Sequence, residues 1–249
     1  MCGRYASSRQ PEDLVEEFEI RGPELPHLEP DFNVAPTKEV YAVVERPPSG
    51  DRDAEPERQL RALTWGLVPF WAKDPKVGSR MINARMETVA EKPAYRRAFE
   101  KRRTILPADG YYEWYPTDQL TKAGKPRKQP YFIRPADQGL LAMAGLYEIW
   151  RDPEKADDDP TRFLWTCTVL TTTAEDSLGH IHDRMPLMLT PDRYAAWLDP
   201  RQADKDALLG LLEPAAPGRL EAFPVSTLVS NVKNNGPELV DPLPLEEVD

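Results

Sequence analysis

Residues 163–173 read Phe-Leu-Trp-Thr-Cys-Thr-Val-Leu-Thr-Thr-Thr and form a long strand-like run. Its large apolar residues recur at every second position from Phe163 to Val169, which is the period of a β-strand with one apolar face. The pattern predicts a strand. It also predicts that the thiol of Cys167, which lies on that face, belongs to the hydrophobic core.

The rest of the chain mixes further strands with a few helices. Three stretches have the apolar spacing of amphipathic helices, and they begin near Pro11, Tyr95 and Pro191. Because strands and helices do not alternate regularly, the pattern favours an α+β fold over a doubly wound parallel sheet. Five more strand-like runs are Val40–Val44, Leu60–Trp65, Tyr111–Tyr115, Tyr131–Arg134 and Leu140–Ile149.

The chain has 249 residues, no internal repeat and no obvious interdomain linker, so we expect residues 1–249 to form a single domain. Three charged segments containing Pro or Gly are expected to be surface loops, near residues 46–58, 116–129 and 151–161. No apolar run approaches the roughly 20 residues of a membrane helix, and the first twenty residues are too charged for a signal peptide. We therefore expect a soluble cytoplasmic protein, with a monomer as the default state.

The charge of the chain is unevenly distributed. The net charge is −10, yet residues 71–134 contain fifteen Lys or Arg against seven Asp or Glu. A basic middle in an acidic chain is compatible with a positive groove that binds a polyanion, whereas the negative remainder discourages such binding elsewhere. A set of solvated helix and loop faces is the alternative interpretation.

Cys2 is the most informative single residue. Removal of Met1 would leave an amine and a thiol two carbons apart, and both groups are nucleophiles. Such a 1,2-aminothiol captures an aldehyde first as a Schiff base and then as a five-membered thiazolidine ring. The alternative is that Cys2 is simply a small second residue.

Two cysteines and three histidines give no disulfide scaffold and no metal-ligand spacing, so we expect no metal and no cofactor. His180 and His182 lie in a polar turn, where neighbouring carboxylates would hold a histidine base. Exposure of both rings to water is the alternative.

Glu113 lies in Tyr-Tyr-Glu-Trp-Tyr, where strand alternation puts it on the same face as Tyr111 and Tyr115. A carboxylate among aromatic rings is partly desolvated, which suits a general acid or base near neutral pH. The alternative is an edge strand with Glu113 facing solvent.

Three further residues have the side chains that a nucleic-acid site requires. Asn83 and Arg85 would point to one side of an extended segment, where an amide binds an amine or carbonyl and a guanidinium binds a phosphate. Trp71 ends an aromatic stretch directly before the basic middle, as expected for base stacking. Structural hydrogen bonding and core packing are the alternatives.

Seven motifs occur in order along nearly the whole chain, and together they are far more specific than any one of them. The motifs are Met-Cys-Gly-Arg-Tyr at 1–5, Phe-Asn-Val-Ala-Pro-Thr at 32–37, Trp-Gly-Leu-Val-Pro-Phe-Trp at 65–71, Ile-Asn-Ala-Arg-Met-Glu-Thr at 82–88, Ala-Asp-Gly-Tyr-Tyr-Glu-Trp at 108–114, Ile-His-Asp-Arg-Met-Pro at 181–186 and Ser-Asn-Val-Lys-Asn-Asn-Gly-Pro-Glu-Leu at 230–239. In these motifs the chain resembles the SRAP family (SOS response-associated peptidase). The resemblance implies an α+β domain in which a mixed sheet or small, partly open β-barrel is flanked by helices.

The resemblance also implies a function, which is to shield abasic sites in single-stranded DNA by covalent capture. Cys2 would be the nucleophile, exposed by autocatalytic or aminopeptidase removal of Met1, and Asn83 would position it. Glu113 would be the acid/base group, and His182 would assist sugar ring opening and Schiff-base chemistry.

The family's DNA contacts map onto five further residues. Arg4, Arg85 and Arg184 match phosphate-binding arginines, and Thr171 falls where a polar contact is expected. Trp71 matches an aromatic residue of the groove, although relatives often have tandem tryptophans where this chain has Phe-Trp. The expected partner is single-stranded DNA with abasic sites, with nucleoid association when the protein is bound to it.

Two other functions fit the same residues. The first is a thiol peptidase that acts on other proteins, since Cys2, His182 and Glu113 are the residue types such an enzyme uses. The second is a non-covalent single-stranded DNA-binding module that uses Trp71 and the arginines.

Overall fold

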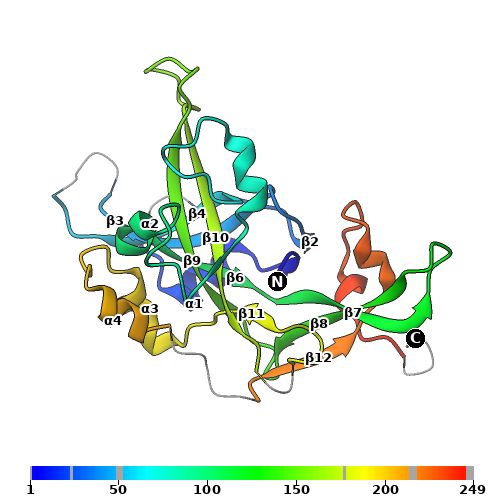
Figure 1. The fold of residues 1–249 in the computed structure, drawn as a ribbon. Coiled ribbons are helices and arrows are strands. Elements are labelled where there is room, and N and C mark those ends of the chain that lie inside the picture. The colour runs from blue at the N-terminus through cyan, green and yellow to red at the C-terminus, as the bar shows by residue number, and fades with distance from the viewer. Residues whose placement is uncertain (1, 23–24, 49–52, 176–177, 213–217, 245–249) are drawn as a thin grey trace.

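Five strands close into a small barrel in the computed structural model, which describes residues 2–22, 25–48, 53–175, 178–212 and 218–244 (Figure 1). The ring runs β10–β4–β3–β6–β9 and returns to β10. The expected α+β class is confirmed, and the barrel is fully closed where a partly open one was expected. Its strands are β3 (Glu39–Arg46), β4 (Glu57–Trp65), β6 (Arg103–Ala108), β9 (Leu141–Arg151) and β10 (Phe163–Thr173).

Strand β10 closes the ring because it has partners along both of its edges. It pairs antiparallel with β9 from Phe163 to Val169, and parallel with β4 at Thr166 and Cys167. With eleven residues, β10 is long enough to pair with both β9 and β4. The sequence run that predicts this strand therefore also closes the barrel.

A second sheet lies beside the barrel and contains the N-terminal segment. It is antiparallel, in the order β2–β1–β7–β8–β12. Its strands are β1 (Tyr5–Ser7), β2 (Asp31–Val34), β7 (Gly110–Leu120), β8 (Pro126–Pro135) and β12 (Leu220–Pro224).

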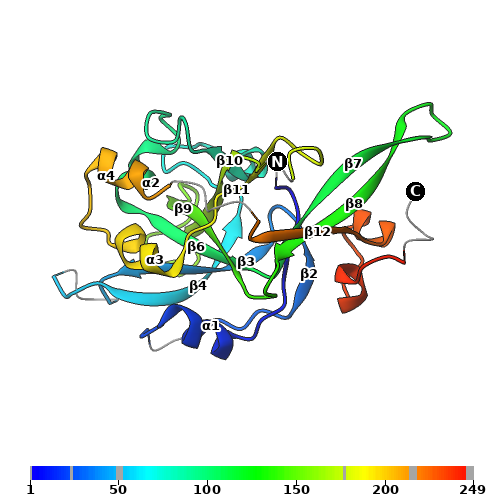
Figure 2. The same cartoon turned by 90° about the horizontal axis from the view of Figure 1, so that it is seen from below.

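Residues 116–129, expected as a surface loop, are instead the outer half of a β-hairpin. Strand β7 continues to Leu120 and β8 begins at Pro126, with Tyr115 paired to Gln129. Both faces of this ribbon are largely exposed, so no alternating apolar residues reveal the strand period in the sequence. In Figure 2 the ribbon projects from the body of the molecule.

The other two charged segments connect barrel strands. Residues 47–56 join β3 to β4, and residues 152–162 join β9 to β10. Part of the first segment, residues 49–52, lies outside the described residues.

Two short strands flank the C-terminal half of β10. Strand β5 (Asn83–Arg85) runs parallel to β10 with Asn83 opposite Val169, and β11 (Arg184–Pro186) runs antiparallel to the end of β10. These pairings bring two motifs that are far apart in the sequence to one end of the barrel.

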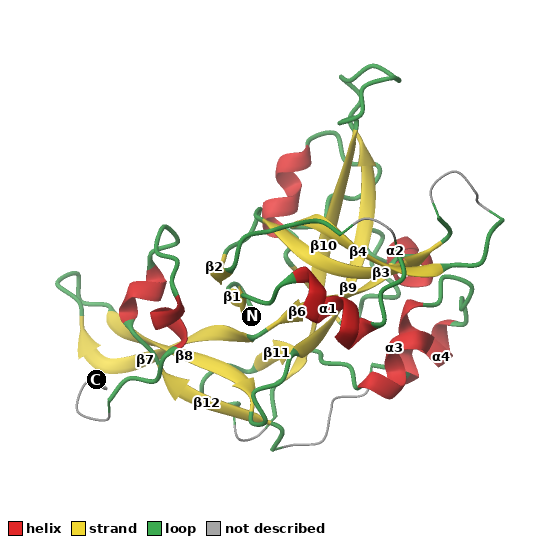
Figure 3. Ribbon diagram, turned by 180° about the vertical axis from the view of Figure 1, so that it is seen from behind, coloured by secondary structure: helices red, strands yellow, loops and turns green. Residues whose placement is uncertain are grey.

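Four short α-helices pack against the barrel (Figure 3). The three expected helices are confirmed, and a fourth begins after Asp204, whose carboxylate caps it by accepting from the N–H of Ala207 over 2.9 Å. The apolar faces of the helices join one face of the barrel strands in a first core cluster. The helices are α1 (Pro11–Phe18), α2 (Arg96–Lys101), α3 (Pro191–Leu198) and α4 (Lys205–Gly210); three 3-10 helices are η1 (Pro75–Arg80), η2 (Thr227–Ser230) and η3 (Pro237–Val240).

The opposite face of the barrel strands forms a second core cluster, which also contains Cys2 and Cys167. Both cysteine side chains are fully buried, so the prediction of a core thiol at Cys167 is confirmed. Across the described residues, no helix is long and apolar enough to cross a membrane.

Candidate functional site

The backbone of Cys2 runs beside strand β7, where it approaches Glu113. The N–H of Tyr112 donates to the carbonyl of Arg4 over 2.9 Å, which extends the β1–β7 ladder toward the start of the chain. In an antiparallel register, the residues before Arg4 lie alongside those after Tyr112. Glu113 is therefore a neighbour of Cys2 in space.

Asn83 holds the Cys2 backbone from the other side. Its Nδ2 donates to the Cys2 carbonyl over 2.7 Å, and the pairing of β5 with β10 fixes the position of this amide. Its Oδ1 is buried and has no hydrogen-bond partner among the described residues. Because an unsatisfied buried acceptor is costly, this oxygen favours one more donor close to Cys2.

The Cys2 thiol is enclosed in the second core cluster. Its Sγ lies 3.9 Å from the Arg4 carbonyl, and the side chain has no solvent exposure. Burial first, and then the charge of Glu113, raises the pKa of the thiol well above its usual range. The thiol is therefore protonated at neutral pH and needs a base before it can act as a nucleophile.

Glu113 has the properties of such a base. Its side chain is 5% exposed, so it does not face solvent as an edge-strand residue would. Burial raises the pKa of this carboxyl to about 7. Near pH 7 the group therefore populates both its acid and its base form, as acid–base catalysis requires.

His182 lies in the turn that leads into β11. Its Nδ1 accepts the backbone N–H of Arg184 over 2.9 Å, which places the proton of the neutral ring on Nε2. Burial lowers the pKa of this ring, so the neutral form prevails at pH 7. The carboxylate of Asp183, 2.9 Å from Nδ1, would form an ion pair with the protonated ring only.

Arg184 and Thr171 form one unit with Glu87. The Arg184 guanidinium binds both carboxylate oxygens of Glu87, at 2.6 and 3.0 Å, and donates to the Thr171 carbonyl over 2.6 Å. Thr171 is fully buried, and its hydroxyl accepts from Arg184 over 3.3 Å. In this arrangement both Glu87 and Thr171 hold the guanidinium of Arg184.

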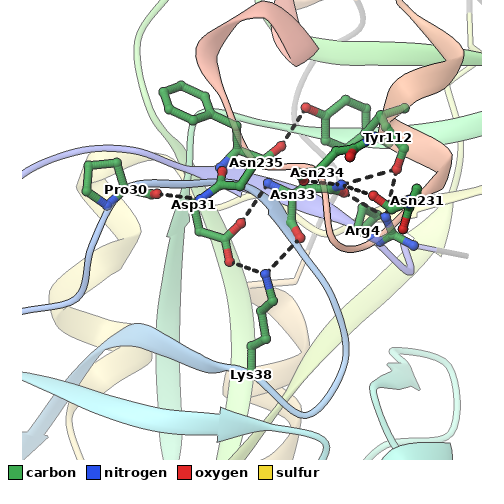
Figure 4. Close-up of polar contacts among 11 residues, drawn as sticks. Arg4, Pro30, Asp31, Asn33, Lys38, Tyr112, Asn231, Asn234 and Asn235 are labelled. Atoms are coloured by element: carbon green, nitrogen blue, oxygen red, sulfur yellow. Dashed lines mark hydrogen bonds and ion pairs between the residues drawn. The ribbon is translucent and has the colours of Figure 1, made fainter.

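Arg4 is held in a network that joins the two ends of the chain (Figure 4). Its Nη1 donates to Asn33 Oδ1 over 2.6 Å and to the Val229 carbonyl over 2.9 Å, and its guanidinium lies 5.5 Å from the ring centre of Trp114. The fully buried Asn33 in turn donates through Nδ2 to three carbonyls. These belong to Val229, Asn231 and Asn234, at 3.2, 3.0 and 2.8 Å.

The sequence alone assigned no role to Asn33, although it lies in the motif at 32–37. The three carbonyls that it binds are 196 to 201 residues away along the chain, so no local spacing reveals them. The neighbouring Asp31 accepts from Lys38 Nζ over 2.6 Å and stabilises the same loop.

Replacing Asn33 by alanine should lower the free energy of unfolding by about 2–4 kcal/mol, because three carbonyls and Arg4 lose their partner. Asn33→Asp should also destabilise, since an ionised carboxylate accepts but cannot donate. Urea denaturation at pH 7 measures both. The matched control is Asn235→Ala, an exposed amide bound to Pro30, and an equal loss in the two alanine variants would contradict the prediction.

The remaining two expected DNA contacts lie at the surface. Arg85 is exposed at the end of β5, and Trp71 is 56% exposed. The neighbouring Phe70 is 46% exposed, and the Arg97 guanidinium lies 4.3 Å from its ring centre. Neither Trp71 nor Phe70 is therefore a core residue.

The structure thus places two of the expected residues beside the backbone of Cys2. Asn83 and Glu113 flank Cys2, and the loop before His182 contributes Leu178 and Ile181 to the core cluster that contains Cys2. Arg85 and Trp71 lie further out, on the solvent side of their segments.

Comparison with known proteins places this site in context. Residues 1–232 match the model of the family described as SOS response associated peptidase (SRAP). The chain is 41% identical over 243 residues to abasic site processing protein YoqW of Bacillus subtilis, covering 97% of this chain and 99% of the relative. It is 34% identical over 252 residues to abasic site processing protein YedK of Escherichia coli, covering 98% and 100%.

The fold is similar to that of solved structures. A protein from Bacteroides thetaiotaomicron superposes with a TM-score of 0.78 at 23% identity, covering 97% of this chain and all of that one. A phage-related protein from Bordetella bronchiseptica superposes with a TM-score of 0.66 at 27% identity, covering 90% and 94%.

Proposed function

Because the chain belongs to the SRAP family, whose members named above are abasic site processing proteins, we propose that it captures abasic sites in single-stranded DNA covalently through Cys2. The contact that carries the proposal is the hydrogen bond from Asn83 to the Cys2 carbonyl, with the Glu113 carboxyl alongside. Together they hold the second residue of the chain where an acid–base group reaches it.

The first step is hydrolysis of the bond between Met1 and Cys2. Water adds to the Met1 carbonyl, the C–N bond breaks, and methionine leaves with a free carboxylate while Cys2 gains an α-amine. Glu113 supplies the acid–base group for this step. The buried Oδ1 of Asn83 is an acceptor for the new ammonium group, beside the carbonyl that Nδ2 already binds.

Capture then joins amine, thiol and aldehyde. The amine adds to the ring-opened sugar aldehyde and water is lost, which gives a Schiff base; the thiolate adds to the same carbon, which closes the thiazolidine ring. One water is released for each adduct. Glu113 takes the thiol proton and returns a proton to the leaving oxygen, a double role that a pKa of about 7 permits.

His182 assists the opening of the sugar. Opening puts negative charge on the ring oxygen as the C1 hydroxyl loses its proton, and the neutral ring of His182 stabilises that oxygen by donating a hydrogen bond from Nε2–H, because Nδ1 accepts from the backbone. The lowered pKa of His182 keeps this form present at neutral pH.

Non-covalent contacts bring the DNA to Cys2. The exposed Arg85 is placed for a phosphate, and the exposed Trp71 offers a face for base stacking. Arg4 and Arg184 are already bound to protein groups, so they order the site and meet phosphates by exchanging those partners.

The test mixes the protein, with its N-terminus verified by intact mass, with single strands that carry one abasic site or none. We expect a denaturation-resistant adduct with the abasic strand alone, whose mass equals protein plus DNA less one water. A protein with a non-removable N-terminal extension serves as the control, because it lacks the free amine. Reversible, salt-sensitive binding to both strands would show a binding module instead, and turnover of added peptides would show a general thiol peptidase.

A further inference from the structure

The hairpin made by β7 and β8 continues as an isolated ribbon beyond the second sheet. β1 pairs with β7 at Gly110 and Tyr111 only, and β12 pairs with β8 from Tyr131 onward. Residues 116–129, which we call the arm, therefore pair only within the β7–β8 hairpin among the described strands. A two-stranded ribbon gains little stability by itself, and Gln129 at the base of the arm is its one buried residue.

The arm has a charge opposite to that of the rest of the molecule. Its only acidic residue is Asp118, so it carries +3 in a chain of −10 and the remainder carries −13. All its basic side chains are exposed. They are Lys122, Lys125, Arg127 and Lys128.

The root of the arm is part of the site. Glu113 and Tyr115 lie on the same strand, and the Tyr115 ring packs edge-on against His180 with 6.2 Å between ring centres. Lys128, at the base of the arm, is close enough for its charge to act on Glu113. The arm thus begins where the capture chemistry occurs and leads outward from it.

The arm and η1 lie on different sides of the N-terminal segment. In Figures 1 and 3, the N-terminal segment passes between the arm and η1, the 3-10 helix that follows Trp71. A strand that stacks on Trp71 and crosses Cys2 therefore leaves toward the arm. At ~3.3 Å per residue, the arm is long enough to follow several phosphates.

We propose that the arm binds the phosphate backbone of the DNA flank that leaves the site on the side opposite Trp71. This inference rests on the proposed function, because it takes DNA at Cys2 as its starting point. Lysines on an exposed ribbon neutralise phosphates without reading bases, so the contact is independent of sequence and sensitive to salt. The acidic body around the arm repels a strand elsewhere and so favours this path.

The test compares two charge-matched variants. Lys122→Gln/Lys125→Gln removes two charges from the outer arm and leaves Lys128, near Glu113, in place. Arg201→Gln/Lys205→Gln removes two exposed charges from the helical side of the molecule. Affinity for an intact single strand is measured over a range of salt concentrations.

We expect the slope of log affinity against log salt to become shallower by about 1.4 in the arm variant, and to stay unchanged in the helical-side variant. An unchanged slope in the arm variant, or an equal change in both variants, would overturn the proposal. If the parent protein forms no adduct with abasic DNA, the proposed function fails, whereas the slopes still report on the arm.

A second measurement follows adduct formation at limiting DNA, with the abasic site near the 5′ end or near the 3′ end. The arm lies on one side of Cys2, so the arm variant should slow capture severalfold for only one of the two strands. Raising the DNA concentration should restore the rate. Equal slowing of both strands would overturn the proposal.

Discussion

Replacement of Cys2 by alanine is expected to abolish covalent capture of abasic DNA, a loss of at least about a thousandfold in rate. The thiazolidine ring needs both the amine and the thiol of this residue, and alanine supplies only the amine. The readout is the adduct band on a denaturing gel, with the N-terminus of each protein checked by intact mass. A Cys2→Ala protein that still gives an adduct band on the denaturing gel, with no reducing agent added to trap a Schiff base, would refute the assignment.

Cys167→Ala is the matched control. This thiol is also fully buried in the second core cluster, yet it lies on β10. The variant should form the adduct at the parental rate and lose about 1 kcal/mol of stability from the smaller side chain. Loss of adduct in this variant, at a temperature where it is folded, would contradict the role given to Cys2.

Glu113→Gln is expected to slow adduct formation by about 10²–10⁴-fold, because glutamine cannot accept the thiol proton. The rate of the parent protein should rise with pH through an inflection near 7, the pKa to which burial raises this carboxyl. Measured on protein whose Met1 has been removed, as checked by intact mass, the variant should lack that inflection and keep the one of the α-amine, near its ordinary pKa of about 8. If the variant keeps the inflection near pH 7, Glu113 is not the group that causes it.

Stability measurements separate loss of chemistry from loss of fold. Burial raises the pKa of Glu113 from 4.5 to about 7, so the folded state binds this proton more tightly than the unfolded state does. The stabilisation of the folded state by this bound proton is fully present below pH 4.5 and is lost as pH rises toward 7. From pH 4 to pH 8 the variant should therefore gain about 3 kcal/mol relative to the parent in urea unfolding. If Glu113→Gln is instead less stable than the parent at pH 8, Glu113 has a structural role.

The elements of the fold are largely encoded in local spacing. The structure confirms the strand predicted over residues 163–173 and the helix predicted from Pro191. Both predictions depend only on the geometry of a single strand or helix. The arm escaped detection, since its exposed faces carry no apolar period. Closure of the barrel was not evident either, because it depends on which strand lies next to β10.

The sequence by itself determined which residue types are present for chemistry: the second-position Cys2, the carboxyl of Glu113 among aromatic residues, and the amide of Asn83. Tertiary structure decided what each of them does. The pKa of Glu113 depends on how completely the fold excludes water from it, and the hydrogen bond from Asn83 depends on two segments meeting beside β10.

The same distinction separates the arginines from their expected contacts. The sequence identified Arg184 as a cation near the site, but only the fold shows that Glu87 and the buried Thr171 already bind it. It also shows that Asn33 accepts from Arg4 through Oδ1 and donates through Nδ2 to carbonyls near the other end of the chain. Local pattern determines secondary structure and chemical inventory, whereas burial and partners arise from packing between distant segments, whose free energies no short stretch of sequence contains.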